Sequence, residues 1–264
     1  MTSQRLRRQD TSEWTTLFPS DIRTRSQSVV FVKRMMVVAV SSITYLRGIF
    51  PEGAYQSRYL EDLCIKVLRE NSAVPGACKV VKWMMGCFDA LEKGYLHILF
   101  IGVHRNAEDP SSIVESYQFK VRYTSDGPQM DIQSSNKLAM RVGLEDTKKA
   151  SVMLVRKLFL LMQNLDVLPS GVSLTMKLYY YDNVTPPDYQ PPGFKEGESD
   201  SLWFEGTAVH FKVGDLQTPF HTMKVQVTAE QDAVERMQRQ KVVREAVAGP
   251  GGAARADQGP GRHE

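Results

Sequence analysis

The sequence has little cysteine and lacks the short motifs that organise common enzyme sites. Its three cysteines, Cys64, Cys78 and Cys87, form no CxxC pair, which argues against a disulfide framework and a zinc knuckle, and we expect them to be reduced core thiols. No GxGxxG, GxxxxGK[ST] or GxSxG motif occurs. The five histidines are scattered without zinc-ligand spacing. We therefore expect no catalytic residues, no metal ligands and no cofactor.

An excess of one charge is also missing. The 264 residues include 33 lysines and arginines against 30 aspartates and glutamates, which gives a net charge of +3. A dedicated nucleic-acid binder needs a stronger positive field, so we expect no direct nucleic-acid binding. Lys33 and Arg34 interrupt the most apolar stretch, residues 29–46, and the first 20 residues lack the apolar run of a secretory signal. These features predict an intracellular protein without a membrane span.

Composition divides the chain into a folded part and two polar ends. Residues 1–24 contain few apolar side chains, which predicts a flexible N-terminal arm. Residues 230–247 have at most the pattern of a marginal charged helix, and residues 248–264 contain no large apolar residue. We therefore expect residues 229–264 to form a disordered tail. The hydrophobic share of 42% is sufficient for a core without disulfide or metal staples. We assign that core to residues 25–228.

Periodic apolar spacing predicts the elements of this folded part. Spacings of three and four residues predict helices over residues 28–47, 59–70, 78–93 and 146–168, the last capped by Asp146. Continuous or alternating apolar runs predict strands over residues 95–103, 117–123, 172–181, 203–213 and 223–227. The first two strands are close enough to form a hairpin. The order of the elements predicts an α+β fold.

Two groups of residues have alternative interpretations. Tyr179, Tyr180 and Tyr181 could stack on single-stranded nucleic acid or form an edge of the core, and the core edge is favoured because only Lys177 is nearby. His97 lies in an apolar strand, which favours a hydrogen-bonded structural histidine over a ligand.

Four prolines between residues 186 and 192 prevent regular ladder pairing. The residues alone thus predict an interaction module whose C-terminal arm docks on its own sheet, with an edge able to accept a peptide strand.

Four dispersed segments resemble the animal meiotic HORMA-domain-containing proteins. They are SITYLRGIFP at residues 42–51, DTKKAS at 146–151, TPPDYQPPGFK at 185–195 and TPFHT at 218–222. The resemblance covers about residues 20–228. It implies a HORMA fold, in which helices cover one face of an antiparallel sheet and a C-terminal safety belt changes sides of the sheet between states. By position, residues 25–181 would form the core and residues 182–228 the belt.

The resemblance also implies a binding site. A short closure-motif peptide would lie beside the strand at 172–181 and contact Ser173, Leu174, Thr175, Met176, Lys177, Leu178, Tyr179 and Tyr180. The belt would close over the peptide with Tyr189, Phe194, Trp203, Phe204, Phe220 and His221. Backbone hydrogen bonds would give sequence-tolerant affinity, and the belt would slow the peptide's escape.

The function implied by the resemblance is that of an adaptor and not an enzyme. The expected partners are closure-motif peptides of meiotic axis proteins or other HORMA proteins, and an AAA+ remodelling ATPase that engages the N-terminal arm. The expected location is the unsynapsed chromosome axis in the nucleus, where such proteins promote double-strand-break formation, homologous recombination, homologue pairing, synapsis and the prophase checkpoint. A HORMA adaptor of the spindle checkpoint or of translesion synthesis is the alternative, which residues 185–195 disfavour. Because residues 229–264 show no closure-motif ending, we expect this chain to receive a closure peptide but not to donate one.

Overall fold

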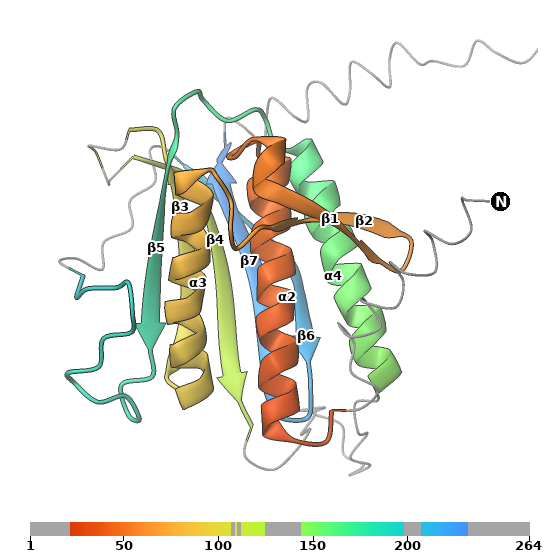
Figure 1. Cartoon of the computed structure of the whole chain (residues 1–264), viewed down its shortest axis with the longest axis vertical. Helices are drawn as coiled ribbons and strands as arrows, with labels where there is room; N and C mark the ends of the chain where they lie inside the picture. The colour runs from red at the N-terminus through yellow and green to blue at the C-terminus, as the bar shows by residue number, and fades with distance from the viewer. Residues whose placement is uncertain (1–21, 107–108, 110–111, 125–143, 198–206, 232–264) are drawn as a thin grey trace, which may run out of the picture.

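Three helices cover one face of a five-stranded antiparallel sheet in the computed structural model, which describes residues 22–106, 109, 112–124, 144–197 and 207–231 (Figure 1). In chain order the elements are α2 (Arg25–Leu46), a 3-10 turn (Glu52–Ala54), β1 (Tyr55–Leu60), β2 (Leu63–Leu68), α3 (Pro75–Lys93), β3 (Leu96–His104), β4 (Ile113–Tyr123), α4 (Leu144–Asn164), β5 (Ser173–Tyr180), β6 (Ala208–Gln217) and β7 (His221–Glu230). The predicted α+β fold, with helices on one face of an antiparallel sheet, is confirmed.

The order of strands in the sheet is β5-β3-β4-β7-β6. The predicted hairpin of β3 and β4 is present and pairs Leu99 with Phe119, while β4 pairs Phe119 with Val225 of β7. β5 and β6 follow each other in the chain but lie at opposite edges of the sheet. The chain between residues 180 and 208 therefore leads from one edge to the other.

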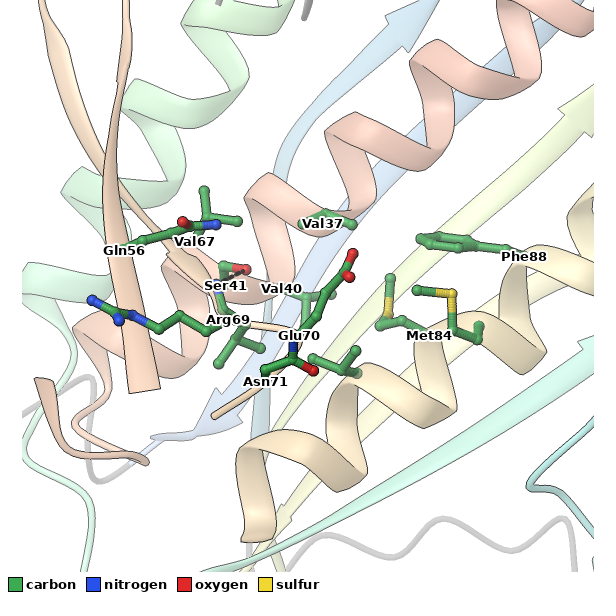
Figure 2. Close-up of a pocket in the computed structure, with 13 residues that line it drawn as sticks. Val37, Val40, Ser41, Gln56, Val67, Arg69, Glu70, Asn71, Met84 and Phe88 are labelled. Carbon is green, nitrogen blue, oxygen red and sulfur yellow. Dashed lines mark hydrogen bonds between the residues drawn. The ribbon is translucent and has the colours of Figure 1, made fainter. Parts of the chain in front are cut away.

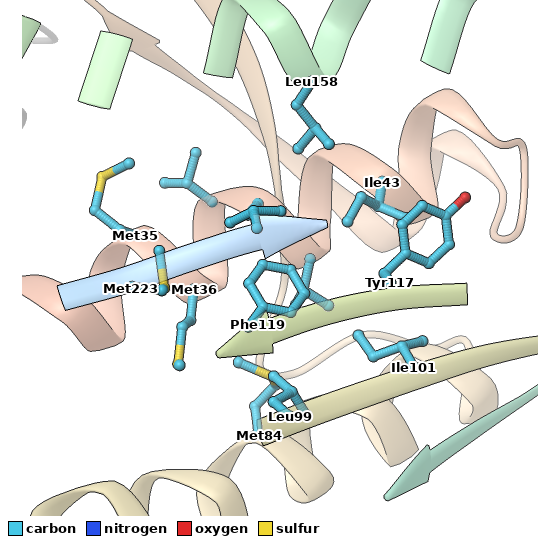
Figure 3. Close-up of a cluster of buried hydrophobic side chains, with 14 of the residues drawn as sticks. Met35, Met36, Ile43, Met84, Leu99, Ile101, Tyr117, Phe119, Leu158 and Met223 are labelled. Carbon is cyan, nitrogen blue, oxygen red and sulfur yellow. The ribbon is translucent and has the colours of Figure 1, made fainter. Parts of the chain in front are cut away.

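α2 runs through the middle of the helical layer (Figure 1). It is long and apolar enough to cross a membrane by length and composition, but 67% of its most apolar stretch of 18 residues is buried within the protein. Figure 3 shows its side chains packed between α4 and the sheet. The residues of this cluster include Met35, Met36, Ile43, Met84, Leu99, Ile101, Tyr117, Phe119, Leu158 and Met223. The prediction of a core helix here is confirmed.

The ends of α2 and α3 follow from local chemistry. Thr24 and Gln27 form a capping box, in which the Gln27 amide N–H donates to the Thr24 hydroxyl at 3.2 Å. Gly94 ends α3 with a φ of 78°, the left-handed conformation typical of a glycine at this position. Ile22, just before the cap, is buried. Most of the predicted arm (residues 1–24) and tail (residues 229–264) lies outside the described residues, but the tail was predicted to begin too early, because Ala229 and Glu230 belong to β7.

The helix predicted over residues 59–70 is wrong, because this segment forms the β1–β2 hairpin. The register pairs Leu60 with Leu63 across a two-residue turn, in which Glu61 has a φ of 53°. The apolar spacing of three and four residues thus arises from two strand ends that flank one turn. Ile65 is fully buried, and the Leu68 amide donates to Ser41 Oγ of α2 at 3.0 Å. Packing against α2 decides the conformation of this segment.

Three smaller predictions are corrected as well. Asp146 is not the N-cap of α4, because the helix already begins at Leu144. The strand predicted over residues 203–213 extends further, because β6 (Ala208–Gln217) continues to Gln217; its predicted start at residue 203 lies outside the described residues. The three free cysteines are not all core residues: Cys87 is buried, but Cys78 is half-buried and Cys64 is exposed on the hairpin.

A buried ion pair joins the end of α2 to β4. Arg47 donates to both carboxylate oxygens of Glu115, at 3.0 Å from Nε and 2.5 Å from Nη2, and both side chains are 4% exposed. The Tyr117 hydroxyl donates to the same carboxylate at 2.5 Å, and burial and the charge of Glu115 raise the pKa of Tyr117. Arg47 also donates to the carbonyls of Leu165 and Asp166, just beyond α4. One guanidinium thereby connects α2, β4 and the end of α4.

Arg47→Ala should lower the free energy of unfolding by about 3–5 kcal/mol, because it leaves Glu115 as an uncompensated buried charge. Urea unfolding measured by circular dichroism checks this value. The double variant Arg47→Met/Glu115→Gln removes both charges and should lose less stability than Arg47→Ala alone. An equal or larger loss in the double variant would show that the buried charge is not the cause.

Candidate functional site

β5 presents one open edge. Its eight residues pair with β3, for example Leu178 with Leu99 and Leu174 with Val103, and no described strand pairs with its other side. Figure 1 shows β5 at the outer border of the sheet. An edge strand of this length is a template for an added strand, because its outward N–H and C=O groups repeat at regular spacing. The main chain here can therefore pair with an extended peptide.

The eight residues predicted to contact a peptide all lie on β5, where they alternate between two faces. Leu174, Met176, Leu178 and Tyr180 pack against the hydrophobic core. Ser173, Thr175, Lys177 and Tyr179 lie on the opposite face, and the Thr175 hydroxyl is 2.7 Å from Nε2 of His104. All eight side chains are half-buried. An added strand would thus meet apolar side chains on one face and mainly polar ones on the other.

The chain that follows β5 returns over α3 and docks there through Tyr189. The Tyr189 hydroxyl donates to Oδ2 of Asp89 at 2.6 Å, and its ring meets Tyr95 and Tyr180 edge-on at 5.0 and 5.4 Å. Lys93 lies 4.9 Å from the ring centroid. Lys93 and the Tyr189 hydroxyl lower the pKa of Asp89, whereas burial and Asp89 raise the pKa of Tyr189. The predicted belt residue Tyr189 therefore fastens this segment beside β5.

Phe194 forms a second contact with α3. It packs directly on the helix backbone at Gly86, where a Cβ atom would lie 2.8 Å from the Phe194 ring and would clash with the carbonyl oxygen of Pro192. Glycine is less favourable than alanine inside a helix by about 1 kcal/mol, so helix formation does not explain Gly86. The space that the docked segment needs at this position does explain it. We name the contacts of Tyr189 and Phe194 with α3 the belt clasp. Sequence reasoning missed Gly86 and Asp89, although a glycine inside a predicted helix was a usable signal.

Phe220 and His221, also predicted belt residues, lie at the β6–β7 turn and not beside β5. His221 is fully buried, and its Nδ1 is hydrogen-bonded to the Ser28 hydroxyl of α2 at 2.6 Å. That hydroxyl is also 2.6 Å from Oγ1 of Thr218. Burial, and to a lesser extent the charge of Arg25, lowers the pKa of His221 to about 4. His221 therefore anchors the hairpin to α2 as a neutral side chain.

The remaining candidates have simple placements. Trp203 and Phe204 lie outside the described residues. Tyr180 packs on the core and Tyr181 stacks on His97 with centroids 4.4 Å apart, which supports the core-edge interpretation of the tyrosine cluster. The His97 ring forms no hydrogen bond with a described residue, so the side-chain hydrogen bond predicted for it is absent from this part of the chain. Stacking holds its ring instead.

A cavity of about 410 Å³ lies between α2, α3 and the loop after β2 (Figure 2). Its apolar floor includes Val37, Val40 and Met84, and its rim carries Arg69 and Glu70. None of the predicted site residues lines it. Among the described residues, no group of three or more histidine, cysteine or acidic side chains is arranged to hold a metal ion.

Comparisons with known sequences agree with the resemblance expected from the four segments. The family model described as HORMA domain matches residues 28–221. HORMA domain-containing protein 1 of Bos taurus is 55% identical over 230 residues, which cover 87% of this chain and 58% of the relative. The Homo sapiens protein of the same name is 55% identical over 222 residues, which cover 84% of this chain and 56% of that relative. The chain thus spans less than two thirds of the length of these relatives.

Solved structures show the same fold. C. elegans HTP-2 bound to HTP-3 closure motif 1 superimposes with a TM-score of 0.70 at 21% identity and covers 82% of this chain and 92% of that one. A chain of the Mitotic Checkpoint Complex crystal structure superimposes with a TM-score of 0.55 at 18% identity, and the match covers 77% of this chain and 98% of that one. The fold predicted from the four segments is confirmed.

Gly86→Ala should release the belt clasp without weakening α3, because the new methyl group occupies the space of Pro192 and Phe194 while alanine favours the helix. Chymotrypsin cleavage after Tyr189 and Phe194 under native conditions should become roughly tenfold faster. Gly53→Ala is the matched control, since a Cβ atom there meets nothing within 4 Å. Equal cleavage rates in the two variants would contradict the clasp.

His221 should make stability depend on pH. Its pKa is about 4 in the folded state and about 6.5 when unfolded, so the unfolded chain binds the proton first as the pH falls. The free energy of unfolding should therefore fall between about pH 6.5 and 4, by about 3 kcal/mol from this residue. Urea unfolding at several pH values should show a flatter dependence for His221→Gln. An unchanged slope in that variant would rule out His221 as the source.

Proposed function

The chain belongs to the HORMA domain family, and from this premise we propose that it is a non-enzymatic meiotic chromosome-axis adaptor that holds closure-motif peptides against β5. The observation that carries the proposal is the open edge of β5 with the belt clasp beside it. The relative named HORMA domain-containing protein 1 supports the meiotic assignment, at 55% identity over 87% of this chain. The HTP-2 structure supports the mode of binding, because that fold holds a closure motif.

In this proposal the peptide adds a sixth strand to the sheet at β5. Main-chain hydrogen bonds to Ser173–Tyr180 supply affinity that tolerates many sequences. Side chains at alternate positions of the peptide then meet the apolar face of Leu174, Met176 and Leu178. Specificity and register both come from this face, because a slip of one residue would turn the peptide's apolar side chains to the opposite face.

The belt governs how long the peptide stays. It is fastened at one end by Tyr189 and Phe194 on α3 and at the other by His221 on α2. A peptide between β5 and the belt leaves only when one of these fastenings opens. The dissociation rate then depends on opening of the belt more than on the area of contact.

An AAA+ ATPase would reopen the belt by pulling the N-terminal segment. Tension applied before Ile22 reaches the Thr24 cap first and then the opening turn of α2. That turn contains Ser28, whose hydroxyl contacts both Thr218 and His221 of the belt hairpin. Unravelling one helical turn would therefore break the buried anchor of the hairpin.

The likeness to HORMA domain-containing protein 1 supports the cellular role that we propose. We place the chain on unsynapsed chromosome axes in the nucleus, where peptide capture supports double-strand-break formation, homologue pairing, synapsis and the prophase checkpoint. The likeness to a chain of the Mitotic Checkpoint Complex favours a spindle-checkpoint adaptor as the second candidate, although its TM-score is 0.55 against 0.70 for HTP-2. Expression restricted to germ cells separates the two roles.

Overlapping synthetic peptides that tile the bovine relative outside its matched 58% provide the test. At least one should bind saturably in fluorescence polarisation and slow hydrogen exchange of the β5 amides, because it completes their ladder. Gly86→Ala should release that peptide roughly tenfold faster, while Gly53→Ala should leave its release unchanged. Binding that protects amides elsewhere, or no binding by any peptide, would contradict the proposal.

A further inference from the structure

The face of the sheet that the helices leave uncovered is rich in basic side chains. In β4, Phe119 and Val121 are buried beneath the helices, so Lys120 and Arg122 point to the opposite face. The register places further lysines on that same face. They are Lys177 of β5, opposite Phe100, Lys212 of β6, opposite Gln226, and Lys224 of β7, opposite Lys120.

Acidic side chains on this face are few. Glu230 forms an ion pair with Arg105 at 3.5 Å, and Asp215 lies opposite Lys224 in the register of β6 and β7. Within the described residues, neither Lys120 nor Lys224 forms an ion pair with a carboxylate. Among the described residues, five basic side chains thus share this face with Asp215 and the ion-paired Glu230, and Asp182, just after β5, is close enough to His97 to affect its pKa. The overall charge of +3 hides this separation, because acidic residues elsewhere balance it.

Two observations show that the charges act together. Lys120 and Lys224 lie directly opposite each other on neighbouring strands, an arrangement that destabilises a sheet through repulsion. His97 lies near them, and its pKa is lowered by burial and then by Lys120 and Arg122, with Asp182 opposing. The face therefore has a positive field, maintained at some cost to folding.

From this geometry we propose that the uncovered face of the sheet binds the phosphate backbone of double-stranded DNA without sequence preference. The five cations occupy several rows and extend from β5 to β6, across roughly 19 Å at the usual strand spacing. One extended acidic peptide follows a single row, whereas the two phosphate strands of a duplex cover a surface of this width. Gln118, Thr222 and Gln226 between the cations are the neutral donors that phosphate contacts use.

This surface is separate from the peptide site. The belt clasp lies on α3, on the other face of the sheet, and the open edge of β5 lies between the two surfaces. One molecule can therefore hold a peptide and touch DNA together. The small net charge alone predicts no direct nucleic-acid binding. The distribution of charge on the folded surface is the more direct guide, and it points to DNA binding on this face.

Fluorescence anisotropy of a labelled DNA duplex of about 20 base pairs with the full chain tests the proposal, between about 50 and 200 mM salt. The logarithm of the affinity should fall against the logarithm of the salt concentration with a slope of about −4.5, as expected for five phosphate contacts. The triple variant Lys120→Gln/Arg122→Gln/Lys224→Gln should bind at least about tenfold more weakly, with a slope shallower by about 3.

The matched control is Lys82→Gln/Lys149→Gln/Lys157→Gln, which removes three exposed charges from α3 and α4 on the helical side. This variant should keep most of the affinity, and thermal unfolding should show both variants folded. Equal losses in the two triple variants, or no binding at about 50 mM salt, would overturn the proposal. Displacement of the duplex by poly-glutamate at lower charge concentration than by unlabelled duplex would assign the face to an acidic protein instead.

Discussion

The connection between the two edges of the sheet is the constraint on which the other features depend. β5 forms one edge and the next strand, β6, forms the other, so a single chain must reach across the domain. Because the β6–β7 hairpin pairs with β4, it is not available to cover β5. The edge of β5 is left open by this topology, and the connecting chain necessarily passes close to anything that pairs there.

The two fastenings of this connection differ in strength. The hairpin end is buried: His221 contacts Ser28, and Met223, Val225 and Val227 complete the core beneath the helices. The belt clasp consists of a partly exposed hydrogen bond to Asp89, the contact of Lys93 with the Tyr189 ring and the packing of Phe194 on Gly86, all at the surface of α3. Local opening selects the least buried contacts first. The belt should therefore open on the α3 side while the hairpin stays in place, so that peptides exchange without unfolding of the core.

Sequence patterns predicted the elements whose signals are local. The apolar run of α2, the apolar stripe of α3 and the alternation of β4 and β5 were sufficient, and the four family segments identified the fold. The β1–β2 hairpin was missed because two strand ends across a turn imitate helical spacing. Gly86, Asp89 and Ser28 were missed because their partners lie about 100 or more residues away. The basic face depends on strand register, which periodicity alone does not provide.

The kinetics of peptide association test the central claim most directly. If a peptide enters only after the belt opens, the observed association rate should rise with peptide concentration and then level off, at a plateau that is the same for different peptides. That plateau is the opening rate, and loosening the contact at Gly86 should raise it. A rate that increases linearly with concentration up to the diffusion-limited range would contradict the account, because it would show that β5 is accessible without movement of the belt.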